Sequence, residues 1–388
     1  MIEHQSVLFA LLIILSLGLI IPIFLRRFGL PLISLLIIIG AIFGPNFLDI
    51  VRINEVLSFF GFLGMIFLMV MTGLEMDVNK LRTTKSKMVI MSLINGGVPF
   101  ITGLLITKYF GYSWTVSLLV GIVFISSSVA IIVPILNNLK FKNKDSKHLI
   151  QSSILFSDVV SLILLGIVFQ KLSPITKLPL NIYFPVLIMS IYVVFKFVPM
   201  ISYYFIKKDV KNSDYENKLR YVIFVVFLLL LFFSLLGVHP ILAAFITGLA
   251  LSGFVNSDKD SKIYNNIHVL SYGLFIPVFF FIVGMQIDFT LFRSFDVSNL
   301  FMISIIVGLI LSKIISGMIS GFIVGMPKRD YLIFGIISTV QLTTTLAVTY
   351  TALSFGIFDP VIVTSVILLS IITTLISPII LNYYFGKR

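Results

Sequence analysis

The sequence contains no cysteine and very little charge. Without cysteine, the 388-residue chain forms no disulfide, no thiolate metal site and no thiol nucleophile. Charged residues make up 11% of the chain, less than half of the roughly 25% found in soluble domains. Hydrophobic residues make up 59%, and a soluble fold of this length could not bury so much apolar surface. The chain is therefore predicted to lie in a membrane, as a single membrane domain over 1–388 without a soluble domain.

The sequence also lacks the motifs of the commonest catalytic and ATP-driven proteins. It contains no Walker sequence, no nucleophile–base pair and no cluster of histidines with metal-ligand spacing. We therefore expect neither an enzyme nor a protein that uses a cofactor. The net charge of +12 would suggest nucleic acid as a partner of a soluble protein. In a membrane protein it first reports topology, because cytoplasmic loops collect Lys and Arg, so no nucleic-acid partner is expected.

Long apolar runs fill almost the whole chain. A membrane-spanning helix needs about 20 mainly apolar residues, and the sequence predicts about thirteen such spans in an all-α polytopic membrane protein. The start, MIEHQ, has no basic region before the first run, which is therefore predicted to stay as a helix. The predicted spans are 7–25, 30–43, 56–73, 88–110, 115–136, 149–170, 182–206, 221–236, 240–255, 269–287, 300–324, 331–353 and 361–383.

The basic residues support this number of spans and orient the chain. If the N-terminus lies outside and the C-terminus in the cytoplasm, 21 of the 28 Lys and Arg residues fall in cytoplasmic loops or the C-terminal tail. Five fall outside, and two lie within predicted helices. A missed or an additional helix would break this alternation. We therefore predict this orientation, in the cell (cytoplasmic) membrane.

Two of the predicted spans carry polar residues across their middles. The span 115–136 contains three consecutive serines at 126–128, and the span 331–353 contains hydroxyl residues around Gln341 and Thr344. Such residues satisfy backbone groups where a membrane helix unwinds. The two spans are seven apart in order, so they cross the membrane in opposite directions. Paired broken helices in inverted repeats are typical of secondary transporters, although hydroxyl residues also serve plain helix packing.

One acidic residue lies deep in a predicted span. Of the 16 acids, Asp158 alone sits near the middle of a helix, in the run FSDVVSLILL. A charge there costs at least about 2.5–3.5 kcal/mol on insertion scales, which makes it a functional candidate. A single carboxylate holds either a proton or a metal cation, the requirement for exchange. The alternative is a neutral, hydrogen-bonded packing acid.

Lys313 is the deepest basic residue and lies at a depth similar to that of Asp158. The two could therefore share a site, although a lysine that snorkels to the cytoplasmic edge is the alternative. Glu75 ends the third predicted span in TGLEMD. It is a candidate for the cation pathway, with a plain interfacial acid as the alternative.

Five segments together resemble the monovalent cation:proton antiporter-2 family, which includes bacterial Na⁺/H⁺ antiporters and Kef-type K⁺/H⁺ antiporters. They are RRFGLPLISLLIIIGAIFGP at 26–45, FLMVMTGLEMD at 67–77, SSSVAIIVPIL at 126–136, HPILAAFITGLALSG at 239–253 and IPVFFFIVGMQIDF at 276–289. The resemblance covers nearly the whole chain. It implies a homodimer of protomers with the sodium/proton antiporter fold, in which two broken helices cross. It also implies a mobile core subdomain at about 88–170 and 300–384, and a dimerisation subdomain at about 1–87 and 218–288.

The resemblance also implies roles for individual residues. Asp158 takes the position of the essential ion-binding Asp, and Ser127 and Ser128 sit where the unwound helix supplies ligands. Lys313 matches the family's Lys that pairs with the first acid of an acidic pair, and that first acid is Ser157 here. With one carboxylate in place of two, we expect electroneutral exchange. Gln341 and Thr344 lie in TVQLTTTLAV, where relatives often carry Arg-Gly-Glu, and are candidate pathway residues.

The sequence thus predicts a monovalent cation:proton antiporter that works by alternating access. Asp158 would bind K⁺ or Na⁺ in competition with H⁺, and backbone oxygens with Ser127, Ser128 and Ser157 would complete the cation site. Expected partners are a second copy of the chain, membrane lipid, and a regulatory element that is either C-terminal or a separate subunit. The cytoplasmic nucleotide-sensing domain of many potassium-type relatives is not expected here. The alternatives are a sodium-coupled symporter for an organic anion on a related fold, and a gated K⁺ efflux channel.

Overall fold

The structure is a computed structural model that describes residues 2–25, 31–75, 85–172, 180–207, 215–255 and 262–386. The described chain is built from helices joined by short turns. Outside the helices it contains an isolated antiparallel β-bridge between Leu139 and Gly386. The helices that precede residue 210 are α1 (Ile2–Leu25), α2 (Leu32–Phe43), α3 (Glu55–Leu74), α4 (Lys85–Tyr109), α5 (Trp114–Ile125), α6 (Val129–Asn138), α7 (Lys144–Leu172) and α8 (Leu180–Lys207). Those that follow are α9 (Tyr215–Leu235), α10 (Pro240–Val255), α11 (Lys262–Leu270), the π-helix η3 (Ser271–Phe275), α12 (Ile276–Met285), the 3₁₀ turn η4 (Phe289–Phe292), α13 (Val297–Ile323), α14 (Lys328–Ile337), α15 (Thr343–Ser354) and α16 (Pro360–Phe385).

The predicted all-helical membrane architecture is confirmed. Within the described residues, eight helices are long and apolar enough to cross a membrane, and four shorter apolar helices accompany them. The two spans expected to be broken are each divided into two helices, α5 with α6 and α14 with α15. The span predicted at 269–287 lies partly in a continuous helix, Ile263–Met285, which contains the π-helical turn η3. The number of thirteen membrane crossings stays a prediction.

The chain forms two compact units. The first comprises 1–61, 79–165 and 277–388, and the second comprises 62–78 and 166–276. This division places residues 1–61 with the broken helices, whereas the sequence-based assignment grouped them with 218–288. The dimerisation role of either segment stays a prediction. Within the second unit, α3 and α10 cross closely, because Gly73 and Gly248 bring the two backbones together.

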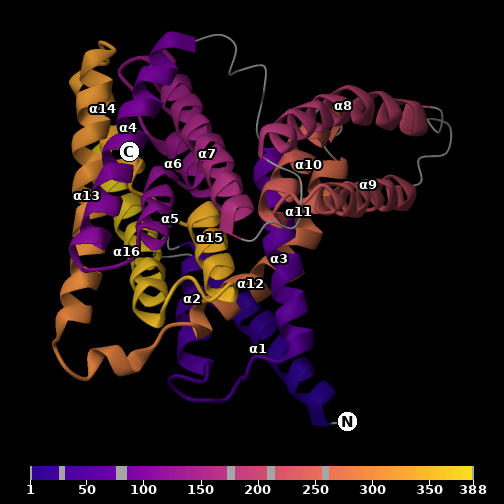
Figure 1. Cartoon of the computed structure of the whole chain (residues 1–388), viewed down its shortest axis with the longest axis horizontal. Coiled ribbons are helices and arrows are strands. Elements are labelled where there is room, and N and C mark those ends of the chain that lie inside the picture. The colour runs from indigo at the N-terminus through magenta and orange to yellow at the C-terminus, as the bar shows by residue number, and fades with distance from the viewer. Residues whose placement is uncertain are drawn as a thin grey trace. The chain divides into compact units, whose positions relative to one another are not determined.

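The first unit contains two structural repeats, α4–α7 and α13–α16 (Figure 1). A step of 215 residues leads from Ser126 to Gln341. The same step carries the bounds of α4, α5, α6 and α7 onto those of α13, α14, α15 and α16 to within three residues. Each repeat therefore consists of a long helix, a broken helix and a second long helix, in that order.

The two repeats are inverted with respect to each other. On α13, Gly308 lies against Thr102 and Ile106 of α4, while Gly317 lies against Asn95 of α4. Residue numbers rise along one helix as they fall along the other, so α4 and α13 are antiparallel. Because α4 and α13 occupy the same place in their repeats, the repeats run in opposite directions, as the sequence predicts.

The ends of α6 and α14 that lie away from the unwound segments are joined by hydrogen bonds. Asp330, in the first turn of α14, is fully buried and accepts hydrogen bonds from the backbone N–H groups of Lys142 and Asn143, at 3.0 and 3.1 Å. These two residues follow α6. Leu139, directly after α6, forms an antiparallel bridge with Gly386, and Arg329 donates to the Phe385 carbonyl. The start of α14, the end of α6 and the end of α16 are thus joined by hydrogen bonds.

Candidate ion-binding site

The two broken helices cross at their unwound segments. Ser126 and Ser128 have extended backbone conformations between α5 and α6, and Leu342 has φ −153° and ψ −76° just before α15. Serine side chains compete with the helix for backbone hydrogen bonds. Three consecutive serines therefore favour a break at this point. The β-branched run Thr343–Thr345 is a weaker signal, because such residues only slightly lower helix propensity.

Hydrogen bonds join the two breaks directly. The Ser128 N–H donates to the Val340 carbonyl at 2.8 Å, and the Ser127 hydroxyl donates to the Ser338 carbonyl at 2.7 Å. In the opposite direction, Gln341 Nε2 donates to the Ser126 carbonyl. Backbone groups that unwinding leaves unpaired in each helix thus find partners in the other one. The carbonyls of Val340, Ser338 and Ser126 are thus already bonded within the crossing.

Asp158 reaches this crossing from the middle of α7. Its side chain is buried, with 1% of its surface exposed. Oδ1 accepts a hydrogen bond of 2.6 Å from the Ser126 hydroxyl. Oδ2 has no hydrogen-bond partner in the described chain. Thr344, at the start of α15, is close enough to interact with the same carboxylate. Asp158 therefore contacts one break through a firm hydrogen bond and keeps its second oxygen available.

Lys313 approaches the crossing from α13, also fully buried. Its ammonium donates to the Ile125 carbonyl at 2.7 Å and to the Ser127 hydroxyl at 3.2 Å. Ile125 is the last residue of α5, where helix carbonyls carry partial negative charge. Lys313 and Asp158 influence each other electrostatically, but no ion pair joins these two described residues. Lys313 thus stabilises the carbonyl end of α5 and leaves Asp158 Oδ2 uncovered.

Several oxygens around the crossing lack a hydrogen-bond partner. Almost all buried polar groups in proteins are hydrogen-bonded. Six buried side-chain oxygens of the described chain are not, and four of these six belong to Asp158, to the cap of α6 or to the first two residues of α15. These four are Asp158 Oδ2, Ser128 Oγ, Thr343 Oγ1 and Thr344 Oγ1. Carboxylate and hydroxyl oxygens are ligands that hard cations prefer. The donor set therefore fits a hard cation.

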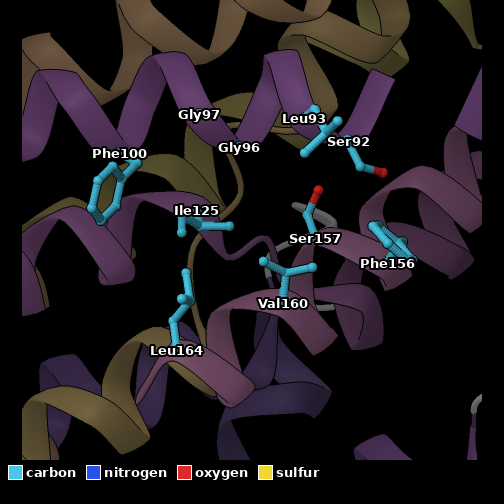
Figure 2. Close-up of a pocket in the computed structure, with 10 residues that line it drawn as sticks. All are labelled: Ser92, Leu93, Gly96, Gly97, Phe100, Ile125, Phe156, Ser157, Val160 and Leu164. Atoms are coloured by element: carbon cyan, nitrogen blue, oxygen red, sulfur yellow. The ribbon is translucent and has the colours of Figure 1, made fainter. Parts of the chain in front are cut away.

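Ser157 faces away from this group of oxygens. Its hydroxyl donates to the Ser153 carbonyl of its own helix at 3.1 Å. Figure 2 shows it pointing toward α4, on the wall of a mostly apolar cavity of about 180 Å³ that lies between α4, the end of α5 and α7. Ser92, also on this wall, donates to the Met88 and Ser153 carbonyls. Ser157 is adjacent to Asp158 in sequence, but its hydroxyl lies on the far side of α7.

The predicted residues thus divide by position. Ser157 lines the neighbouring cavity, whereas six of the predicted residues lie at the crossing. The six are Asp158, Lys313, Ser127, Ser128, Gln341 and Thr344. Glu75 follows α3 in the second unit, where Tyr264 donates to its carboxylate at 3.4 Å. Its place on a cation pathway stays a prediction.

Sequence reasoning missed two residues of this region. Ser126 provides the hydrogen bond to Asp158, although the sequence analysis chose the next two serines as ligands. Asn95 of α4 is buried and bonds to Lys313. The signal for Asn95 was its polar side chain within an apolar helix.

Comparison with known proteins identifies the family. The family model described as sodium/hydrogen exchanger, transmembrane, matches residues 11–386. A probable Na⁺/H⁺ antiporter 3 of Methanocaldococcus jannaschii is 30% identical over 386 residues, covering 99% of this chain and 98% of that protein. The Na⁺/H⁺-K⁺ antiporter GerN of Bacillus cereus is 26% identical and covers 93% of this chain and 92% of its own length.

The fold has a match among solved structures. The sodium proton antiporter MjNhaP1 of Methanocaldococcus jannaschii at pH 8 superposes with a TM-score of 0.73 and 19% identity, covering 99% of this chain and 97% of that one. The chain is thus a multi-pass membrane transporter rather than an enzyme, and it belongs to the transmembrane sodium/hydrogen exchanger family.

Proposed function

We propose that the chain exchanges one monovalent cation, K⁺ or Na⁺, for one proton by alternating access, with both ions competing for Asp158. The observation that carries this proposal is a single buried carboxylate at the crossing of two broken helices. One of its oxygens is held by Ser126, and the other lacks a protein partner. A proton or a cation would bind this second oxygen, and the two could not occupy it together.

The cation is proposed to bind between Asp158 and the first turns of α6 and α15. The hydroxyls of Ser128, Thr343 and Thr344 lack protein partners in the described chain, which leaves their lone pairs available. Ser127 is a weaker candidate ligand than the sequence suggested, because its hydroxyl already bonds to Ser338 and Lys313. These oxygens do not discriminate between K⁺ and Na⁺, so both stay in the proposal.

The charge at the crossing supports an electroneutral exchange. Lys313 and Asp158 contribute one positive and one negative charge, and no second carboxylate stands beside Asp158 because position 157 is serine. If Lys313 stays protonated, replacing a proton on Asp158 by one monovalent cation leaves the total charge unchanged. A strong response of the transport rate to an imposed membrane voltage would contradict this stoichiometry.

The remaining predictions belong to this proposal. The basic residues support a cell-membrane protein with the N-terminus outside and the C-terminus in the cytoplasm, and the family resemblance supports a homodimer. The regulatory partner stays a prediction.

Purified protein in liposomes with an internal pH dye tests the proposal. Addition of Na⁺, K⁺ or Li⁺ on one side should move protons, and Asp158→Asn should abolish this signal. The matched control is Asp359→Asn, because Asp359 caps α16 through the Ile362 N–H and asparagine caps helices equally well. Asp359→Asn should transport normally, and normal transport by Asp158→Asn would refute the proposal.

The same liposomes separate the alternatives. An exchanger shows saturable counterflow of labelled cation, whereas a gated K⁺ channel does not. A sodium-coupled symporter would move no protons in the absence of an organic anion.

A further inference from the structure

Asn95 is a buried amide at the centre of the first unit with no role in the cation site itself. It lies in α4 with 2% of its surface exposed. An unpaired amide in an apolar interior costs about 1–3 kcal/mol, so such a residue persists where its hydrogen bonds matter.

The Asn95 amide nitrogen connects three helices. Nδ2 lies 3.0 Å from the carbonyl of Lys313 and 3.1 Å from the hydroxyl of Ser316, both on α13. It lies 3.3 Å from the hydroxyl of Ser338, the residue that caps the end of α14. The carbonyl of Ser338 in turn accepts the hydrogen bond from Ser127 in the other break. One side chain on α4 thus links the Lys313 backbone to the break between α14 and α15.

The backbone hydrogen bonding of α4 is interrupted at Asn95. Pro99 has no N–H, so the helical hydrogen bond to the Asn95 carbonyl cannot form. Gly96 and Gly97 follow directly and lower helix propensity further. A β-carbon at Gly96 would lie 3.2 Å from the Ile125 side chain, which shows how closely α5 ends against α4 at this point (Figure 2). The side-chain bonds of Asn95 therefore fix a segment of α4 that its own backbone holds less firmly.

The arrangement is reciprocal between the repeats. Lys313 belongs to the second repeat and binds the carbonyl end of α5 in the first. Asn95 belongs to the first repeat and binds the residue that ends α14 in the second. Lys313 takes part in both contacts. Its backbone carbonyl accepts the hydrogen bond from Asn95, and its ammonium donates to the Ile125 carbonyl. Moving either contact would move the ammonium relative to Asp158.

We infer that Asn95 is a positioning residue for transport, which holds Lys313 and the second break in the geometry that the cation site requires. This inference rests on the proposed function. It assigns no ion contact to Asn95, which acts through Lys313 and Ser338.

The test uses Asn95→Leu, which keeps a similar volume and removes the amide. Apparent cation KM, maximal rate and the pH profile of exchange are measured in liposomes, and the melting temperature is measured in detergent. We expect the cation KM to rise at least about tenfold, as is typical when a residue that orients ion ligands by hydrogen bonds is removed. The pH profile of exchange should also shift. Asn95→Gln, which keeps the amide, should restore part of the loss.

Two further variants keep the test decisive. Ser338→Ala removes one acceptor of the Asn95 amide and should raise the cation KM in the same direction, so it replaces Asn95→Leu if that variant fails to fold. Thr107→Val is the control, because Thr107 is also a buried residue of α4 but its hydroxyl bonds only to the carbonyl of Gly103 in the same helix. Thr107→Val should leave KM and the pH profile unchanged.

The outcomes separate the two proposals. If the unaltered protein exchanges ions and Asn95→Leu or Ser338→Ala keeps its KM and pH profile, the positioning role is wrong, even when the melting temperature falls. If the unaltered protein moves no protons on addition of any cation, the proposed function is wrong and the transport role of Asn95 is refuted with it.

Discussion

The two repeats of the first unit share one backbone plan but differ in charge. In the first, Asp158 accepts a hydrogen bond from Ser126, 32 residues earlier. In the second, Thr373 accepts one from the Gln341 N–H, also 32 residues earlier. The step of 215 residues that relates Ser126 to Gln341 relates Asp158 to Thr373 as well. The carboxylate of one repeat is thus replaced by a hydroxyl in the other.

The hydrogen bonds of the two residues differ accordingly. Thr373 also donates to the Leu369 carbonyl at 2.8 Å, so its hydroxyl both donates and accepts within the protein. Asp158 keeps one oxygen without a partner in the described chain. The comparison teaches that the repeated backbone builds the crossing, whereas only the first repeat of the described chain places a carboxylate at this position.

The largest expected effect comes from making the first repeat like the second. Asp158→Thr removes the only carboxylate that the described residues place at the crossing. It should reduce exchange at least about 100-fold, to background, because no carboxylate remains there to hold the proton. Proton flux into liposomes after cation addition measures this loss. The converse change, Thr373→Asp, should not restore exchange when combined with Asp158→Thr. Restored exchange would show that the repeats are functionally equivalent.

The next effect concerns Lys313, a charge of the second repeat that has no counterpart in the first, where the step of 215 residues leads to Val98. Lys313→Ala removes a buried donor from the Ile125 carbonyl and the Ser127 hydroxyl, and a hydrogen bond to a charged group contributes about 1.5–3 kcal/mol. We expect the melting temperature to fall by several degrees, with a smaller change in cation affinity. An unchanged melting temperature with lost cation binding would reverse the assignment and make Lys313 part of the ion site.

Gln341 should have an intermediate effect, because it links the two breaks without contributing charge. Gln341→Leu leaves the Ser126 carbonyl and the Thr345 hydroxyl without their partner, at a cost of about 1–3 kcal/mol. Thermal unfolding should report this loss, together with slower exchange. Wild-type stability would mean that the crossing is held by its backbone contacts alone.

The pH dependence of exchange sharpens the comparison further. If proton and cation compete for Asp158, as proposed, deprotonation frees the carboxylate for the cation, and the apparent cation KM should fall as pH rises. The limiting change is about tenfold per pH unit for one proton. Exchange rates measured at several cation concentrations and pH values give this slope. A KM that is independent of pH would mean that proton and cation use different groups.

The smallest effect is expected at the second repeat's own position. Thr373→Val removes an acceptor from the Gln341 N–H and should lower stability by about 1 kcal/mol, with exchange within about twofold of the unaltered protein. Liposome flux and melting temperature are both required. A large loss of exchange with unchanged stability would show that ions bind at Thr373 during transport.

Much of this arrangement could be predicted from the sequence. Hydrophobic runs indicated a helical membrane protein, and the polar residues at 126–128 and around Gln341 located both breaks. Asp158 and Lys313 stood out because charge is costly within apolar helices, and both lie at the crossing. The antiparallel contact of α4 with α13 then confirmed the inverted repeats.

The contacts of individual hydroxyls could not be predicted. Helical periodicity does not tell which of three consecutive serines faces α7 once the helix has unwound, so Ser126 was missed in favour of Ser127 and Ser128. Ser157 is adjacent to Asp158, but successive residues of a helix are about 100° apart, which carries its hydroxyl to another face. The π-helical turn η3 likewise left no signal in the apolar run at 269–287.

The hydrogen bonds that join the end of α6 to the start of α14 bear on how this transporter moves. Asp330 fastens the start of α14 to the residues after α6, and Gly386 is paired with Leu139. The inner ends of α6 and α14 are held at the crossing by Ser127, Ser128 and their partners. Because α6 and α14 are joined at both ends, neither can slide along the other without breaking these hydrogen bonds. If the chain works by alternating access, as proposed, we therefore expect α6 and α14 to move together as one rigid body.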